Sequence, residues 1–206
     1  MESHATTCNL RCELQLLFDI INMETTTDDE HRHYMRIALA EARKSPPKPT
    51  NFCVGACLVT PSQTNKPSSK APLITGYTLE CAGNTHAEQC CFIKLSSHYN
   101  CTEDTLGEHL PDGTALYTTM EPCNKRSVGN MSCVERILGL KKQHGTQAIA
   151  KVYVGAAEPE TFVGVNEGRR RLEEAGVRVV HVPGMEEEIL AVATTGHEKG
   201  GNALNC

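Results

Sequence analysis

A histidine, a glutamate and two cysteines are the residues of this sequence whose types and spacing suggest chemistry most clearly. His86 and Glu88 stand in the run His86-Ala87-Glu88, and Cys123 and Cys133 follow downstream. One neutral imidazole and two thiolates supply three ligands to a tetrahedral Zn²⁺, and they balance its charge. Three protein ligands leave the fourth position to water, as in catalytic zinc sites. The pattern therefore predicts a catalytic zinc centre.

Glu88 has a different role in this prediction, because it stands two residues from His86 on what we expect to be one helical turn. Bound zinc lowers the pKa of its water ligand and so generates hydroxide near neutral pH. A carboxylate beside that water can accept its proton and return it to a leaving group. We expect Glu88 to be the catalytic acid and base, and not a metal ligand.

The segments that must position these residues alternate between strand and helix patterns. Apolar, β-branched runs predict strands over residues 52–60, 72–80, 115–120, 152–155 and 177–182. Helical spacing predicts helices over residues 28–44, 86–95, 133–142, 165–175 and 185–193. We expect loops over residues 61–70 and 96–113. Such alternation is typical of a layered α/β domain.

Length and composition limit the possible classes of protein. The chain has 206 residues, which suits one domain, and its net charge is −5 with 4% aromatic residues and no Trp. An acidic chain with few aromatics lacks the field and the stacking surfaces that bind nucleic acid. We expect an N-terminal extension over residues 1–26, a catalytic domain over 27–194 and a C-terminal tail over 195–206.

The cysteine content indicates a reducing compartment. Eleven cysteines are an odd number, and two of them are predicted metal ligands, so a disulfide framework is not expected. The apolar run 14–21 is interrupted by Asp19 and has no cationic segment before it, which argues against a signal peptide and a membrane span. We expect a cytoplasmic protein that does not bind membranes, with most other cysteines buried.

Three motifs resemble the cytidine deaminase-like superfamily. They are Asn51…Val54-Gly55-Ala56, Thr85-His86-Ala87-Glu88 and Tyr117-Thr118-Thr119-Met120-Glu121-Pro122-Cys123. The superfamily signature is His-x-Glu followed by Pro-Cys-x-x-Cys, with the Glu as general acid and base. Here nine residues separate the two cysteines, instead of two. The resemblance implies a three-layer fold whose central mixed five-stranded sheet is flanked by helices.

The wide cysteine gap narrows the resemblance to the pyrimidine deaminase of riboflavin biosynthesis, most closely its fungal, stand-alone form. The segments that carry it are residues 122–133, 154–160 and 168–176. This resemblance implies hydrolysis of 2,5-diamino-6-ribitylamino-4(3H)-pyrimidinone 5'-phosphate to 5-amino-6-ribitylamino-2,4(1H,3H)-pyrimidinedione 5'-phosphate and ammonia, by a homodimeric zinc enzyme. Bacterial relatives carry an added reductase, for which this chain is too short.

Two adjacent cations beside a metal ligand are candidate phosphate contacts. Lys125 and Arg126 follow Cys123 within the insert 124–132, and both residue types bind phosphate through charge-assisted hydrogen bonds. The alternative is an ordinary solvated loop. Asn51 resembles the substrate-binding Asn of the superfamily, since an amide donates and accepts at once. Its alternative is a turn residue after Pro49.

Three further substrate contacts are implied. The backbone N–H of Ala87, together with that of Cys123, is placed to stabilise a tetrahedral intermediate. Glu158 and Glu160 follow the predicted strand 152–155 and resemble the polyol-binding positions of the family, although the family often has Asn where this chain has Glu160. Ligands commonly bind at such carboxyl ends of strands in open α/β sheets.

Two other groups of titratable side chains are interpreted as surface features. We expect His98, His109 and His144 to be solvent-exposed, and the run 169–171 of three arginines to form a solvated helix face. Neither group is assigned a function.

Two alternative functions stay open. One is a cytidine or dCMP-type nucleotide deaminase, although such enzymes usually keep the two-residue cysteine gap. The other is a non-catalytic, zinc-bound scaffold that binds a partner enzyme. A structural metal does not need Glu88, so its presence favours an enzyme.

Overall fold

The computed structural model describes residues 28–60, 71–157 and 167–197. The chain divides into two compact units, residues 1–33 and 34–206, and the described part of the first, residues 28–33, is helical. The expected extension 1–26 lies outside the described residues, as do residues 198–206 of the expected tail. Within the described ranges, no helix is long and apolar enough to cross a membrane.

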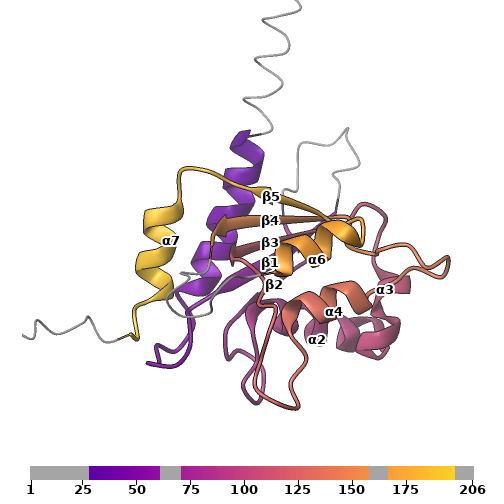
Figure 1. Cartoon of the computed structure of the whole chain (residues 1–206), viewed down its shortest axis with the longest axis horizontal. Coiled ribbons are helices and arrows are strands. Elements are labelled where there is room, and N and C mark those ends of the chain that lie inside the picture. Colours follow the sequence, from indigo (N-terminus) through magenta and orange to yellow (C-terminus); the bar gives the residue numbers. More distant parts are fainter. Residues whose placement is uncertain (1–27, 61–70, 158–166, 198–206) are drawn as a thin grey trace, which may run out of the picture. The chain divides into compact units, whose positions relative to one another are not determined.

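Five strands form one mixed sheet in the second unit (Figure 1). They are β1 Gly55–Val59, β2 Ile74–Tyr77, β3 Ala115–Met120, β4 Lys151–Ala156 and β5 Arg178–His181. Their order is β2-β1-β3-β4-β5, with β1 antiparallel to both of its neighbours and β3, β4 and β5 mutually parallel. The expected mixed five-stranded sheet is confirmed.

Helices precede, connect and follow these strands. Residues 34–42 are helical, and the later helices are α2 Ala87–Tyr99, η1 Glu103–Thr105, α3 Leu106–His109, α4 Cys133–Gly139, α6 Gly168–Glu174 and α7 Glu186–Ala193.

Two of the sequence expectations about helices are wrong. The expected loop 96–113 contains the end of α2 and the short helices η1 and α3, because Leu106 and Leu110 are buried in the core and hold this segment against α2. Helix α4 ends at Gly139 instead of residue 142, because the next residue, Leu140, turns into an extended conformation and is buried. The short helix α3 was missed because Leu106 and Leu110 are too few apolar residues to show a helical period in a polar run.

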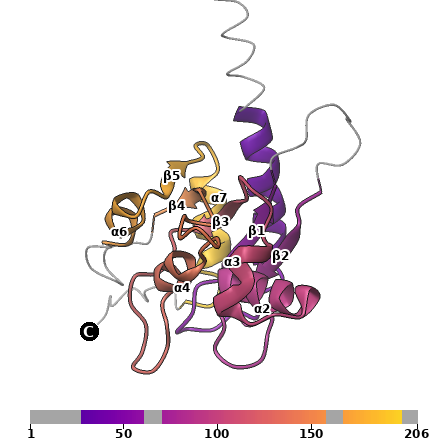
Figure 2. The same cartoon turned by 90° about the vertical axis from the view of Figure 1, so that its right-hand side faces the viewer.

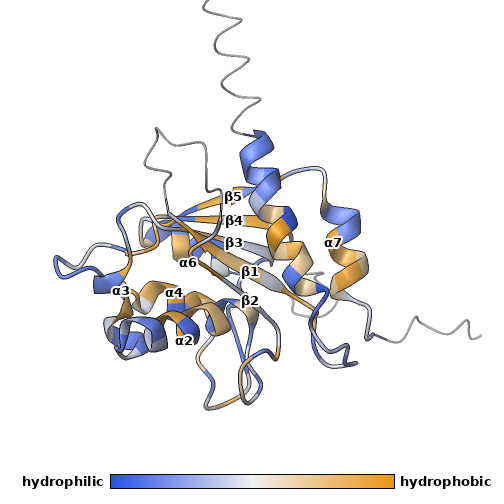
Figure 3. Ribbon diagram, turned by 180° about the vertical axis from the view of Figure 1, so that it is seen from behind, coloured by the Kyte–Doolittle hydropathy of each residue, from blue (hydrophilic) through white to orange (hydrophobic). Residues whose placement is uncertain are grey.

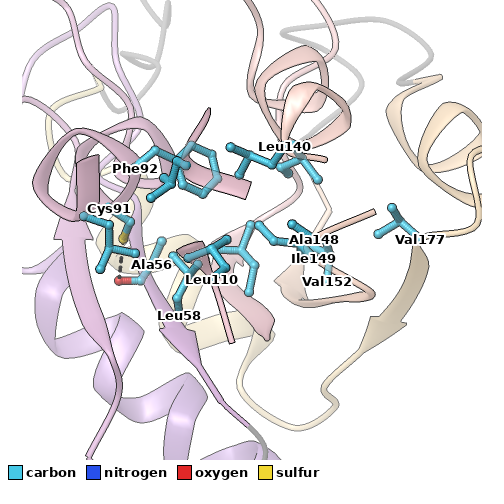
Figure 4. Packing of buried hydrophobic residues seen from close by; sticks show 14 of the residues in the cluster. Ala56, Leu58, Cys91, Phe92, Leu110, Leu140, Ala148, Ile149, Val152 and Val177 are labelled. Carbon is cyan, nitrogen blue, oxygen red and sulfur yellow. Dashed lines mark hydrogen bonds between the residues drawn. The ribbon is translucent and has the colours of Figure 1, made fainter. Parts of the chain in front are cut away.

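The sheet lies between two layers of helices because successive side chains of each strand point to opposite faces. Ala56 and Leu58 of β1 pack in one cluster with α2, α3, α4 and α6 (Figures 2 and 4). Cys57 and Val59 pack in a second cluster with residues 34–42 and α7, whose apolar sides are seen in Figure 3. The three-layer α/β fold predicted from the resemblance is confirmed.

The described cysteines outside the metal site are mostly small core residues. Cys53, Cys57, Cys90 and Cys91 are buried, and none of the described cysteines forms a disulfide. Burial raises the pKa of the Cys57 thiol to about 12, so this side chain is a neutral thiol. Cys91 donates to the Ala56 carbonyl at 3.7 Å, the contact drawn dashed in Figure 4.

Gly55 allows the helix formed by residues 34–42 to approach β1 closely. A Cβ atom at Gly55 would lie 1.9 Å from the carbonyl oxygen of Ala38 and 2.4 Å from the nitrogen of Ala42. We predict that Gly55→Ala lowers the free energy of unfolding by about 3 kcal/mol, since backbone atoms must move. Urea denaturation of the zinc-loaded protein measures this.

The matched control is Gly139→Ala, because a Cβ at that position meets no atom within 4 Å. We expect it to change the unfolding free energy by less than about 1 kcal/mol. Equal stability of the two variants would contradict the packing described for β1.

Candidate metal centre and active site

His86, Cys123 and Cys133 converge from three segments that are distant in sequence. Their ligand atoms all lie within 4.8 Å of one another, and His86 Nδ1 is 3.4 Å from each of the two sulfur atoms. His86 is the residue before α2, Cys123 follows β3, and Cys133 begins α4. One nitrogen and two sulfur donors, largely enclosed by protein, fit Zn²⁺ with one position left for water.

Two helix starts place these ligands. His86 is the N-cap residue of α2, and its backbone is extended, with φ −89° and ψ 161°. Ser132 begins α4 through a capping box, in which its hydroxyl accepts from Glu135 N at 3.2 Å and its backbone N–H donates to the Glu135 carboxylate at 2.7 Å. These hydrogen bonds lower the pKa of Glu135 and fix the residue immediately before Cys133.

The two cysteines share a proton. The hydrogen bond from the Cys133 thiol, followed by contacts with His86, lowers the pKa of Cys123 to about 4. Donating that bond, together with burial, raises the pKa of Cys133. In addition, the backbone N–H of Cys133 donates to the Cys123 sulfur at 3.4 Å. Cys123 is therefore a thiolate by itself, and a metal ion would release the proton of Cys133.

Glu88 lies beside the metal ligands, and its side chain is buried. One carboxylate oxygen is 3.4 Å from the Cys133 sulfur, and the other is 3.4 Å from the hydroxyl of Thr118. Burial raises the pKa of Glu88. The Thr118 hydroxyl donates to the Met120 carbonyl at 3.0 Å and also lies within hydrogen-bond distance of Glu88, so it links the end of β3 to the buried carboxylate. Sequence reasoning did not identify Thr118.

A cavity of about 430 Å³ opens at this centre, within the size range of small-molecule sites. Its lining includes His86, Glu88 and Cys123, together with the predicted substrate contacts Asn51 and Lys125. The structure therefore brings these five residues to one cavity. Ala87 begins α2 between the first two of them and is fully buried.

The predicted contacts Asn51 and Arg126 both meet Asn84, which sequence reasoning did not identify. The Asn51 amide donates to Asn84 Oδ1 at 2.9 Å and accepts from the Thr50 hydroxyl at 2.9 Å. Arg126 donates to the Asn84 carbonyl and, at 3.1 Å, to Gln89 Oε1. Arg126 thus ties the insert to the start of α2, whereas Lys125 lines the cavity.

Glu158 and Glu160 lie outside the described residues, so their predicted role stays a prediction. The strand before them, β4, ends at Ala156, which pairs with Met120 of β3. Glu121 N, one residue further, donates to the Ala156 carbonyl at 3.0 Å. The two strands therefore end side by side at the edge of the sheet that carries Cys123.

The arginines of α6 form a face that is exposed at Arg169 and Arg170, as expected, and half-buried at Arg171. Arg170 pairs with Glu174 of its own helix at 2.7 Å. Arg169 instead lies 3.7 Å from the Glu121 carboxylate, and Arg171 donates to Asn124 Oδ1 at 2.6 Å. Two of the three side chains therefore contact the segment that contains Cys123.

His197 is a cavity residue that the sequence did not reveal, since it falls in the expected tail. Its Nε2 lies 3.2 Å from the Asn51 carbonyl, which can only accept, so Nε2 carries a hydrogen. Its ring lies 4.7 Å from that of Phe52. The preceding residue, Gly196, lets the chain pass close to Lys48, because a Cβ at Gly196 would lie 2.3 Å from the Lys48 nitrogen.

Comparison with known proteins places this metal centre in a family. Residues 28–156 match the family described as the cytidine and deoxycytidylate deaminase zinc-binding region. The chain belongs to this family of zinc-binding deaminase domains, and His86, Cys123 and Cys133 are positioned to bind a metal ion.

Relatives within the family are more specific. Over 167 residues the chain is 36% identical to the diaminohydroxyphosphoribosylamino-pyrimidine deaminase of Schizosaccharomyces pombe; the match covers 81% of this chain and 36% of that protein. The chain thus spans about a third of that relative's length.

Crystal structures of the Rib2 deaminase of Aspergillus oryzae, in a C-terminal deletion mutant, are similar in sequence and fold. The structure at pH 4.6 is 45% identical with a TM-score of 0.74, and the match covers 82% of this chain and 93% of that one. A complex with DARIPP at pH 6.5 is 43% identical with a TM-score of 0.72, and covers 82% and 92%.

Removing a sulfur ligand should remove the metal. We predict that Cys133→Ala lowers zinc affinity by more than about 100-fold, since even residues that only orient ligands contribute about 10- to 100-fold. Zinc per chain after dialysis against a chelator measures this. Cys101→Ala, a half-buried cysteine outside the site, should retain full zinc. Equal zinc content in both variants would rule out Cys133 as a ligand.

Proposed function

We propose that this chain catalyses the deamination step of riboflavin biosynthesis. Its substrate is 2,5-diamino-6-ribitylamino-4(3H)-pyrimidinone 5'-phosphate, and water replaces an amino group to give the pyrimidinedione phosphate and ammonia. The observation that carries this proposal is the pair of ligands Cys123 and Cys133, joined by a nine-residue insert that brings Lys125 to the cavity beside Glu88. The likeness to Rib2 deaminase and its complex with DARIPP supports it.

The reaction needs a proton to move from water to the substrate, and Glu88 is placed to move it. His86, Cys123 and Cys133 would hold a zinc ion, which as a Lewis acid would lower the pKa of a water molecule. Glu88 accepts one proton of the attacking water and delivers it to a ring nitrogen. It then takes the second proton from the new hydroxyl group and delivers it to the amino group, which leaves as ammonia as the carbonyl forms. Its raised pKa, caused by burial, suits a group that must hold a proton between these steps.

The backbone at the start of α2 contributes to substrate binding in this proposal. Ala87 is the first residue of α2, and the first N–H groups of a helix have no acceptor within it. We assign the Ala87 N–H to the developing charge on the pyrimidine ring. Hydrogen-bond donors fixed in this way stabilise a transition state because they need no reorganisation.

The two cations of the insert have different roles. Lys125 lines the cavity and has no hydrogen-bond or ion-pair partner among the described residues, so its ammonium is available to a phosphate. Arg126 donates to Asn84 and Gln89, so it orders the cavity wall. We therefore assign the phosphate to Lys125 and a supporting contact to Arg126.

The ribityl chain is assigned to the part of the cavity between the metal and Lys125. Asn51 lines it, held by Asn84. An amide in this place can bind hydroxyl groups as donor or acceptor. Glu158 and Glu160 are proposed as further polyol contacts on the family resemblance alone.

We propose a homodimer in the cytoplasm that binds neither nucleic acid nor membranes. The described cysteines are free thiols, as is usual in a reducing compartment, and the net charge of −5 disfavours polyanionic partners.

A cytidine or dCMP deaminase is the second candidate, because the matched family model describes that zinc-binding region. Ammonia release from the ribitylamino pyrimidine phosphate, cytidine and dCMP, each with the zinc-loaded chain, separates the two functions. Turnover of cytidine or dCMP alone would overturn the riboflavin assignment. No turnover of any of the three would favour the non-catalytic scaffold.

Glu88→Gln should abolish proton transfer and keep the metal. We predict that kcat falls roughly 10³-fold, within the range attributed to general acid–base catalysis, while zinc content is unchanged. The exposed Glu187→Gln on α7 is the matched control and should keep wild-type kcat. Near-native turnover by Glu88→Gln would show that another group carries the proton.

Lys125→Met should weaken binding of the phosphorylated substrate specifically. We predict a KM about 10-fold higher or more, since a hydrogen bond to a charged group contributes about 1.5–3 kcal/mol. The dephosphorylated substrate should show no such change, and Lys151→Met, at an exposed position on β4, should behave as wild type. An equal KM for both substrates in Lys125→Met would contradict the phosphate assignment.

A further inference from the structure

The insert that joins the two sulfur ligands has a middle part with little packing. Val128 is fully exposed, and Met131 is 49% exposed, although both are apolar. Residues 127, 129 and 130 are exposed as well. The middle of the insert therefore cannot fix the distance between Cys123 and Cys133, and that restraint must come from its two ends.

One arginine of α6 reaches the first end. Arg171 Nη1 donates to Asn124 Oδ1 at 2.6 Å, and Asn124 directly follows Cys123. The Arg171 side chain is half-buried, which strengthens a charged hydrogen bond relative to one in open solvent. The backbone at Cys123 is fixed further by its carbonyl, which accepts from Val134 N at 3.2 Å.

The second end of the insert is fixed by the capping box of α4. Glu135 N donates to the Ser132 hydroxyl at 3.2 Å, and the Glu135 carboxylate accepts from the backbone N–H and the hydroxyl of Ser132, directly before Cys133. The contact between Arg171 and Asn124 is therefore the side-chain restraint at the first end, which complements the cap at the second.

We propose that Arg171 is a positioning residue that keeps Cys123 at the correct separation from Cys133 by restraining the start of the insert at Asn124. This inference rests on the proposed function, since the zinc centre serves the reaction. In the part of the chain that the structure describes, Arg171 acts through Asn124 and does not line the cavity. Replacing Arg171 should therefore speed the release of zinc and change the geometry of the metal ligands, with a smaller effect on substrate binding.

The matched variants are Arg171→Met and Arg170→Met. Arg170 is the neighbouring residue on α6, and its ion pairs, with Glu167 and Glu174, are exposed. Both variants remove one cation from the same helix, so general changes of charge cancel. We expect unchanged stability in Arg170→Met, because exposed ion pairs contribute little.

The experiment measures metal release and metal geometry without substrate. We expect zinc transfer to a chromophoric chelator to be about 10- to 100-fold faster from Arg171→Met than from wild type, the range found for residues that orient ligands. Arg170→Met should differ from wild type by less than about twofold, as expected for an exposed ion pair. In the cobalt-substituted proteins, the sulfur-to-cobalt absorption bands should shift in Arg171→Met only.

Two further variants test whether Arg171 acts through Asn124. Asn124→Leu removes the acceptor and should reproduce the faster release, and the double variant should be no faster than either single variant, since the two residues act as one unit. Asn124→Asp keeps an acceptor and should release zinc at the wild-type rate. If Arg171→Met does not fold, Asn124→Leu carries the test alone.

Wild-type zinc release and unchanged cobalt bands in Arg171→Met, or in Asn124→Leu if it is the variant that folds, would overturn the inference, even if the melting temperature falls. Such a result would make the contact only a stabilising one. Failure of the proposed function is distinguishable, because it would appear as wild-type protein that binds zinc normally and does not deaminate the ribitylamino pyrimidine phosphate.

Discussion

The structure depends on bringing two cysteines, an imidazole and a carboxylate together around a single, largely buried point beside the cavity. Cys133 and Glu88 are 0% and 2% exposed. The hydrogen bond to Cys123, together with burial, raises the pKa of Cys133, and burial raises the pKa of Glu88. Buried acidic groups at this distance cannot all ionise without a cation. A divalent metal supplies that charge, and it makes the same cluster chemically useful. Metal binding offsets the free-energy cost of burying these ionisable groups together, so both the stability of the site and its chemistry require the metal.

The fold meets this requirement by ending several elements at one edge of the sheet. Strand β3 ends at Met120 beside Ala156, the end of β4, and Cys123 follows at once. Helix α2 begins after His86, and α4 begins at Cys133, so two helix starts lie at the site, and the first N–H of α4 donates to the Cys123 sulfur. The helix clusters on the two faces of the sheet keep these ends in register, and the exposed insert between the sulfur ligands only has to span them.

The sequence predicted the metal ligands and the catalytic carboxylate better than it predicted the residues around them. Ligand identity depends on residue type, so His86, Cys123 and Cys133 were recognisable without any knowledge of the fold, and the strands followed from apolar runs. Thr118, Asn84 and His197 could not be predicted, because they reach the site through tertiary approach that leaves no local period. The contacts of Arg169 and Arg171 were missed for a similar reason: a polar run shows that a helix face is exposed, as Arg169 and Arg170 are, but it does not show which of its charges meets a neighbouring loop. Glu158 and Glu160 stay predictions.

The most direct test of hydrolytic deamination at this centre is the mass of the product formed in ¹⁸O-labelled water. The zinc-loaded chain is incubated with the ribitylamino pyrimidine phosphate, and product and ammonia are quantified together. The account predicts one ¹⁸O atom in each pyrimidinedione, one ammonia for each substrate consumed, and no product from chelator-treated protein until zinc is restored. Product without the label, or labelled product formed equally well without zinc, would contradict it.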